Sequence, residues 1–275
     1  MKRSLLYLLA SMLFQFSLFA QIPAPQFEGE EVFKNEDVVF HKIDDHTWVG
    51  TGHLSANESI YLIEGNEKAV LLDAATRITD LDKIVASITD KPVTLMLTHV
   101  HPDHVGAASY FPVVYLNPGD KDAASGMMSN YEGEFKYLED GQIIDLGGRQ
   151  LEVVFTPGHT WGCATYIDKE AGYGFSGDAF GSGNLLLFTG SFETLIASCE
   201  KMSTIMKKEG IEYLYPGHYR GNNPETQQRI DDMITLSKDV LSGKEKGEES
   251  QGRFGFNRII TKYGVRINYS DQALE

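Results

Sequence analysis

The chain has 275 residues and a net charge of −15 at pH 7, from 24 Lys and Arg against 39 Asp and Glu. A polyanion of this kind repels phosphate backbones, which excludes nucleic acid as the expected partner. Two cysteines are too few for a disulfide scaffold in a chain of this length. We expect Cys163, in a predicted strand, and Cys199, on a predicted helix face, to be buried free thiols.

Residues 1–20 have the pattern of a secretory signal peptide. Lys2 and Arg3 precede an apolar run that ends at the small residue Ala20. The run is shorter than a spanning helix and contains polar residues, so we expect no stable membrane insertion after its removal. The pattern predicts a secreted or periplasmic protein with a loose lead-in at 21–35, one domain at 36–241, and a C-terminal linker and tail at 242–275 packed on that domain.

The first half of the chain is predicted to contain a group of strands followed by alternating helices and strands. Apolar runs bounded by turn residues predict strands at 38–43, 47–51, 59–63, 69–72, 93–97 and 113–116. A capping box from Thr79 to Asp82 predicts a helix with an apolar face at 81, 84, 85 and 88. Short helices are expected at 105–110 and 118–129. Residues 130–141 lack a clean period and are expected to form a surface loop or a lid.

The second half predicts another group of strands, at 142–146, 151–155, 164–167, 173–175 and 213–215. One helix is expected after a Ser191 cap and another from Asn223-Pro224. Residues 242–252 read as a solvated linker, and the tail to Tyr269 as an edge strand or a segment packed on the body. Two strand groups with helices after strands indicate an α/β protein, a sandwich of two sheets with helices on both outer faces.

Three of the eight histidines lie together at 98–104, Thr-His-Val-His-Pro-Asp-His. This segment follows a predicted strand, and ligands of open α/β sheets bind at the carboxyl ends of strands. The segment carries His99, His101, Asp103 and His104, which exceed the three protein ligands typical of one catalytic zinc. The cluster therefore indicates two neighbouring metal ions.

Three further polar residues follow strands directly behind a glycine. His159 and His218 each follow a Pro-Gly pair, and Asp178 follows Gly177. Each alone is typical of an ordinary turn, but together they complete two ligand sets. His99, His101 and His159 can hold one ion, Asp103, His104 and His218 the second, and Asp178 can bridge them. Imidazole and carboxylate ligands without thiolate favour Zn(II), and they also suit Fe or Mn.

Residues Thr98–His104, Thr156–Thr160, Ser176–Asp178 and Pro216–His218 resemble the motifs of the metallo-β-lactamase-fold superfamily of metallohydrolases. The resemblance covers about 38–220 and implies an αββα four-layer sandwich with a dinuclear site at one edge of the sheets. It also implies that Asp73, at the end of a strand, orients the ligand loop from outside the metal shell. Asp178 at the bridging position looks like glyoxalase II and lactonases, whereas common exported zinc β-lactamases have Cys there.

The resemblance implies an exported hydrolase in which a hydroxide bridging two divalent ions cleaves an ester, thioester, lactone or amide of a small molecule. Asp103 would be the catalytic residue, because it both binds metal and orients the nucleophile. A β-lactamase of the same fold and an iron-dependent oxidoreductase similar to persulfide dioxygenases are the alternatives. Phe180, Phe188 and Tyr219, next to ligands, are candidate substrate contacts, although 180–188 equally fits a core strand.

Overall fold

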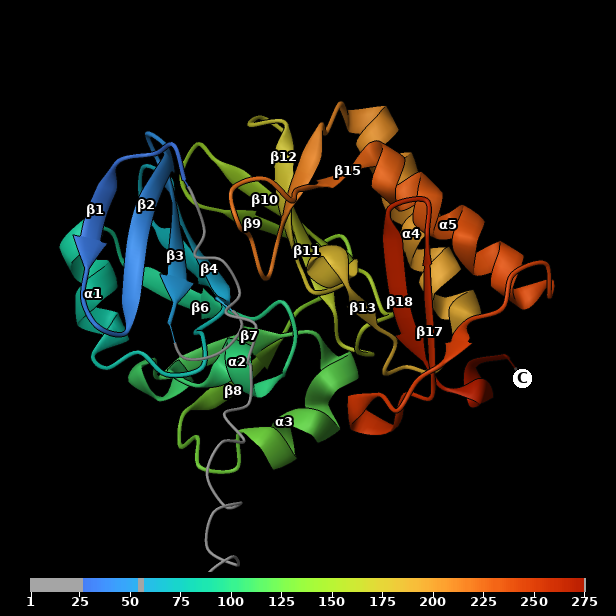
Figure 1. The fold of residues 1–275 in the computed structure, drawn as a ribbon. Helices are drawn as coiled ribbons and strands as arrows, with labels where there is room; N and C mark the ends of the chain where they lie inside the picture. The colour runs from blue at the N-terminus through green and yellow to red at the C-terminus, as the bar shows by residue number, and fades with distance from the viewer. Residues whose placement is uncertain (1–26, 54–56, 275) are drawn as a thin grey trace, which may run out of the picture.

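The computed structural model describes residues 27–53 and 57–274, and the predicted signal peptide at 1–20 lies outside them. Its strands form two large sheets and one small one (Figure 1). The first sheet has the strands in chain order: β1 (Glu31–Lys34), β2 (Val38–Asp44), β3 (Thr47–Gly52), β4 (Ser59–Glu64), β5 (Ala69–Leu72), β6 (Val93–Met96), β7 (Val113–Leu116) and β8 (Glu134–Tyr137). It is antiparallel up to β5 and parallel from β5 to β8.

The second sheet has the order β15-β14-β12-β11-β10-β9. Its strands are β9 (Ile143–Asp145), β10 (Gln150–Phe155), β11 (Ala164–Asp168), β12 (Tyr173–Gly177), β14 (Tyr213–Pro216) and β15 (Glu225–Thr226). The small sheet comprises β13 (Leu185–Leu186), β16 (Glu248–Glu249), β17 (Arg258–Lys262) and β18 (Val265–Tyr269). Through β18, which pairs with β13, the C-terminal tail is joined to the body.

Helices α1 (Leu81–Ile88), α2 (Pro102–Val105) and α3 (Lys121–Met127) follow strands of the first sheet, and α4 (Phe192–Glu209) and α5 (Gln227–Leu241) belong to the second half. Single 3₁₀ turns lie at Ala108–Tyr110, Pro118–Asp120, Gly181–Gly183, Arg253–Gly255 and Asp271–Leu274. No helix within residues 27–53 and 57–274 is both long and apolar enough to span a bilayer.

Three apolar clusters separate the layers. One fills the space between the two large sheets, with Val49 and Leu72 from the first and Val153 and Phe175 from the second. The other two lie on the outer faces, one under α1 and one under α4 and α5. This is the predicted αββα sandwich. Period-2 alternation is weak in its strands because both faces of each sheet are covered.

The α4 helix forms where the sequence predicted it. The Ser191 hydroxyl accepts a hydrogen bond from the Thr194 N–H, and the stripe of Leu195, Cys199, Met202 and Met206 is buried. Gly210 ends the helix at φ +69°, a conformation that glycine adopts without a Cβ clash. Both cysteines are buried and free, as expected.

Several predicted boundaries are wrong. Thr79 does not cap α1, because the residue preceding the helix is Asp80, whose side chain makes no cap hydrogen bond. The predicted loop at 130–141 contains β8, and the lead-in contains β1, both edge strands that sequence patterning marks poorly. Asn223-Pro224 leads into β15, and Thr226 caps α5. The helix predicted at 118–129 is present as a 3₁₀ turn that continues into α3, whereas the one predicted at 105–110 is divided between the end of α2 and the turn at Ala108–Tyr110. The strand β16 lies within the predicted linker.

Candidate metal centre

The ligand loop begins where β6 ends, and a carboxylate from the neighbouring strand anchors it. Asp73 follows β5, and its two oxygens accept hydrogen bonds from the N–H and the hydroxyl of Thr98, each at 2.7 Å. The same carboxylate lies 2.9 Å from Nδ1 of His104. Because Nδ1–H donates to Asp73, the His104 ring is fixed with Nε2 turned into the site. Asp73 thus lies where the sequence predicted a loop-orienting residue.

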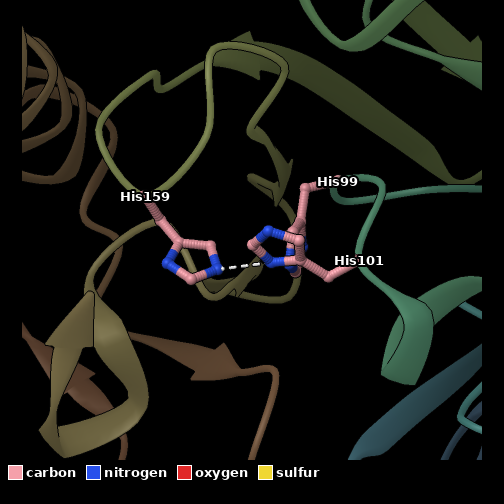
Figure 2. A group of neighbouring side chains, drawn as sticks. All are labelled: His99, His101 and His159. Atoms are coloured by element: carbon pink, nitrogen blue, oxygen red, sulfur yellow. Dashed lines mark hydrogen bonds between the residues drawn. The ribbon is translucent and has the colours of Figure 1, made fainter. Parts of the chain in front are cut away.

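Three imidazoles converge at one side of the site, His99 and His101 from the ligand loop and His159 from the turn after β10 (Figure 2). Nδ1 of His101 lies 3.0 Å from Nε2 of His99 and 2.9 Å from Nε2 of His159. Nδ1 of His159 donates to the Leu186 carbonyl at 2.8 Å, which leaves its Nε2 as a lone pair. Lone-pair nitrogens approach this closely only with a proton or a cation between them, so the arrangement suits a metal ion.

A second set of ligand atoms comprises Asp103, His104 and His218. Oδ2 of Asp103 lies 3.6 Å from Nε2 of His218 and 4.0 Å from Nε2 of His104. Oδ2 of Asp178 lies 3.3 Å from Nε2 of His218, 3.7 Å from Nε2 of His104 and 3.8 Å from Nε2 of His159. A single oxygen of Asp178 therefore faces residues of both sets, as a bridging ligand must.

The donors fit divalent metal ions. Nε2 of His104 is buried and has no hydrogen-bond partner, and a buried polar atom in this state is costly unless something binds it. The donors grouped around it are imidazole nitrogens and carboxylate oxygens, the ligands that Zn(II), Fe and Mn accept. The residues could hold two ions of this kind.

Glycine before His218 is required by the packing of the centre. A Cβ on Gly217 would lie 2.5 Å from Oδ1 of Asp178 and 2.9 Å from Cε1 of His104. Any other residue would displace a ligand. The Pro-Gly-His pattern therefore has a steric cause at this position.

Burial and charge divide the imidazoles into two electrostatic groups. Burial, followed by the neighbouring imidazoles, lowers the pKa of His99 far below its ordinary value and that of His101 to about 4. Burial also lowers the pKa of His159. These three rings are neutral at pH 7, the form that binds metal.

The other two imidazoles have the opposite shift. Burial opposes the charged form of His104, but the Asp73 and Asp178 carboxylates outweigh it and raise the pKa of His104 well above its ordinary value. Asp178 likewise outweighs burial and raises the pKa of His218. These two rings must therefore lose protons before they bind a metal ion.

Two supporting residues were missed by the sequence reasoning. Asp120 accepts hydrogen bonds from the Val100 N–H at 3.0 Å, the Thr160 hydroxyl at 3.0 Å and the Gly162 N–H at 2.7 Å, so it joins the ligand loop to the turn that carries His159. Asn-Pro-Gly-Asp at 117–120 repeats the strand, Pro-Gly, polar residue pattern that marks His159 and His218, and that signal could have found it.

The second is Ser182. Its hydroxyl donates to Oδ1 of Asp178 at 3.1 Å and accepts from the His218 N–H at 3.2 Å. This leaves Oδ2 of Asp178 free to face the imidazoles. Ser182 has φ +48°, and its sequence context, Gly-Ser-Gly, reads only as a turn.

A cavity of about 630 Å³ opens onto the ligands. Phe188 lines it, as predicted for a substrate contact, but Phe180 and Tyr219 do not. Phe180 is fully buried in the cluster under α4, because the turn after Asp178 directs its side chain into the core. The Tyr219 ring packs against Phe27 and Tyr215, and its neighbour Arg220 reaches the cavity instead.

An αββα sandwich with a His- and Asp-lined centre at one sheet edge defines the metallo-β-lactamase fold. The family model described as "Metallo-beta-lactamase superfamily" matches residues 56–218, more than half of the chain, and the protein belongs to this superfamily. Its members are mostly hydrolytic enzymes.

Individual relatives have different activities. An acyl-coenzyme A thioesterase of Homo sapiens is 26% identical over 215 residues, with 62% of this chain and 76% of the relative covered. A hydroxyacylglutathione hydrolase of Synechococcus sp. (strain JA-3-3Ab) is 29% identical over 195 residues, covering 64% and 74%. A mitochondrial persulfide dioxygenase of Bos taurus is 30% identical over 188 residues, covering 64% and 71%.

Solved structures share the fold. A metallo-β-lactamase from Erythrobacter litoralis superimposes with a TM-score of 0.59 at 18% identity, covering 76% of this chain and 99% of that one. A metallo-β-lactamase from Pontibacter korlensis has a TM-score of 0.59 at 16% identity, covering 74% and 100%. At this identity the likeness supports the architecture alone.

Proposed function

We propose that the protein is a hydrolase that uses two divalent metal ions, zinc foremost, to cleave an ester, thioester, lactone or amide bond of a small molecule. One observation carries the proposal: a single carboxylate oxygen of Asp178 faces both ligand sets, within 3.8 Å of the imidazole nitrogens of His104, His159 and His218. The thioesterase and the hydroxyacylglutathione hydrolase among the relatives support the reaction class.

Two divalent ions held by these residues would supply Lewis acidity and would lower the pKa of a water molecule toward neutrality. The chain positions the reactants. Asp103 lines the cavity with a side chain that is 28% exposed, so its carboxylate can accept a hydrogen bond from the attacking water and take its proton. Asp73 and the Leu186 carbonyl fix the rings of His104 and His159 through their Nδ1 atoms. No side-chain nucleophile is required.

The experiment measures metal content and hydrolysis together. We expect two zinc ions per chain, and a loss of hydrolysis on the order of 10²–10⁴-fold in Asp103→Asn and His101→Ala, with an unchanged circular dichroism spectrum. Asp90→Asn, at an exposed carboxylate paired only with Lys91, is the matched control. Wild-type turnover in either Asp103→Asn or His101→Ala contradicts the mechanism.

The persulfide dioxygenase relative favours a second candidate, an iron-dependent oxidoreductase. This candidate predicts one iron per chain and oxygen consumption with a persulfide. The second ligand set of Asp103, His104 and His218 favours the hydrolase instead. A β-lactamase activity belongs to the same hydrolytic chemistry, and turnover of a cephalosporin in the same substrate panel would reveal it.

We further infer that the chain is exported to the periplasm or the medium. The support is the sequence of residues 1–20, with two basic residues, an apolar run and a terminal Ala. Expression of the full chain followed by N-terminal sequencing of the exported protein tests this, and Gln21 is the expected first residue. An uncleaved protein in the cytoplasm contradicts it.

A further inference from the structure

We propose that the cavity binds an acyl substrate with two unlike ends, an apolar acyl group against Met127, Phe188 and Phe254 and an oxyanion, carboxylate or phosphate, at Arg220. The inference rests on the proposed hydrolase function and names the class of substrate for it.

The apolar wall begins at the metal ligands. The Phe188 ring lies 5.0 Å from the His101 ring and 5.3 Å from the His159 ring, between centroids, and is 38% exposed. The Phe254 ring continues the wall at 5.8 Å from Phe188, and Met127 of α3 lines the same cavity. An exposed apolar surface that begins on the ligands is the kind of surface on which a substrate buries its apolar part.

Phe254 is unusual in both its exposure and its backbone conformation. It is 71% exposed, and its backbone is left-handed at φ +64°, which costs a residue with a Cβ about 1 kcal/mol. Exposure of this degree means that its ring contributes little to the core, so the fold alone does not explain an aromatic here. Contact with a bound ligand does. Phe254 also lies beyond residues 56–218, so the tail adds to the apolar wall from outside the region that the family model matches.

The cation lies on the other side of the centre. Arg220 is two residues from His218, is exposed, and is the sole Lys or Arg among the described residues that line the cavity. Across residues 27–53 and 57–274, the arginines that form ion pairs are Arg149, Arg229 and Arg258, and the Arg220 side chain forms none, although the chain carries a net charge of −15. A guanidinium left unpaired in an acidic protein is available to an oxyanion.

The two features lie on opposite ligand sets. Phe188 packs on His101 and His159, whereas Arg220 follows His218. A substrate that contacts both therefore spans the centre, which places its scissile carbonyl beside the ligands. The volume of about 630 Å³ is within the range of small-molecule sites.

Two thioester series test the inference on the zinc-loaded full chain. The first extends the acyl group from acetyl to hexanoyl on N-acetylcysteamine, a neutral thiol. The second keeps the hexanoyl group and changes the thiol to 3-mercaptopropionate, with a carboxylate, or phosphopantetheine, with a phosphate. We expect kcat/KM to rise two- to threefold per methylene, since each is partly buried, or about 15- to 80-fold over four. We expect roughly tenfold higher kcat/KM for at least one anionic thiol, and the preferred one identifies the oxyanion.

Variants assign each preference to its residue. Phe254→Ala should reduce the hexanoyl-to-acetyl ratio at least fivefold, while Tyr263→Ala, at another exposed tail aromatic with positive φ outside the cavity, should retain it. Arg220→Gln should remove most of the preference for the anionic thiol, and Arg220→Lys should keep part of it. Arg266→Gln, at an exposed arginine outside the cavity lining, is the control.

Hexyl thioethers of the same thiols, which cannot be hydrolysed, separate the two possible failures. Binding by calorimetry that depends on Phe254 and Arg220, without hydrolysis of any thioester, refutes the proposed reaction and supports the binding site. Hydrolysis without dependence on acyl length or charge, or with wild-type ratios in both variants, refutes the binding site alone. Neither binding nor hydrolysis refutes both.

Discussion

Replacing Asp73 by Asn should weaken the metal centre although Asp73 is not itself a ligand. The carboxylate accepts three hydrogen bonds within 2.9 Å, two from Thr98 and one from His104, and is 1% exposed. Asn has nearly the same shape but one acceptor oxygen and one NH₂ group. The NH₂ group must therefore face at least one of the three donors, and one buried donor is left without an acceptor.

The magnitude follows from this count. An unsatisfied buried donor costs about 1–3 kcal/mol, and loss of charge assistance in the remaining bonds costs roughly another 1 kcal/mol. The free energy of unfolding of the metal-free protein should fall by about 2–4 kcal/mol, a decrease in Tm on the order of 10 °C. Metal affinity should fall 10- to 100-fold, because the His104 ring is no longer fixed.

Urea denaturation of the metal-free protein and chelator competition for zinc measure the two effects. Asp90→Asn, at an exposed carboxylate, controls for the change of charge. An Asp73→Asn protein with the unfolding free energy and the zinc affinity of the wild type would refute the reasoning, because the hydrogen bonds to Thr98 and His104 would then carry no energy.

Three further predictions concern the pH dependence of metal binding, the hydrogen bonds of Asp120 and the pH dependence of stability. In metal-free protein the raised pKa values of His104 and His218 mean that binding the second ion releases protons, so its affinity should fall as pH drops from 8 to 6. The affinity for the first ion should change less with pH, because the pKa of His101 is about 4. Calorimetry in two buffers checks this, and an equal pH dependence of the two affinities would contradict it. Asp120→Ala leaves two buried N–H groups unpaired and should cost about 2–5 kcal/mol of unfolding free energy in urea. Burial raises the pKa of Glu225 to about 7 despite its Arg229 partner. The contribution of the Glu225 carboxyl to the stability of the fold is therefore fully present below about pH 4.5 and is lost as pH rises to 7. Between pH 4.5 and 7, the unfolding free energy of Glu225→Gln should therefore fall by up to about 3 kcal/mol less than that of the wild type. An equal fall in both proteins would contradict the assignment.

The metal ligands could be predicted from the sequence because their positions are local. Each candidate follows an apolar run and a turn residue, and carboxyl ends of strands meet at one sheet edge. His159, Asp178 and His218 were named on this ground, and the structure brings them to the ligand loop. Gly217 shows that the accompanying glycine also has a local steric reason.

The substrate side was less predictable because a loop residue does not reveal its direction. Phe180 and Phe188 lie in one segment, yet the first is buried and the second is 38% exposed. Tyr219 turns toward Phe27, and Arg220 reaches the cavity. One residue of register decides between core and ligand contact, and register is fixed by packing against distant elements.

The sequence by itself determined the α/β architecture with two groups of strands and the order of the ligands, since both depend on strand patterning and short motifs. Only the tertiary structure decided which residues support and surround them. Asp120 acts across 40 residues on Thr160, and Phe254 reaches the cavity because β18 pairs with β13 and carries the tail to the site. Such contacts join segments far apart in the chain, and a local sequence pattern does not indicate which distant segments will come into contact.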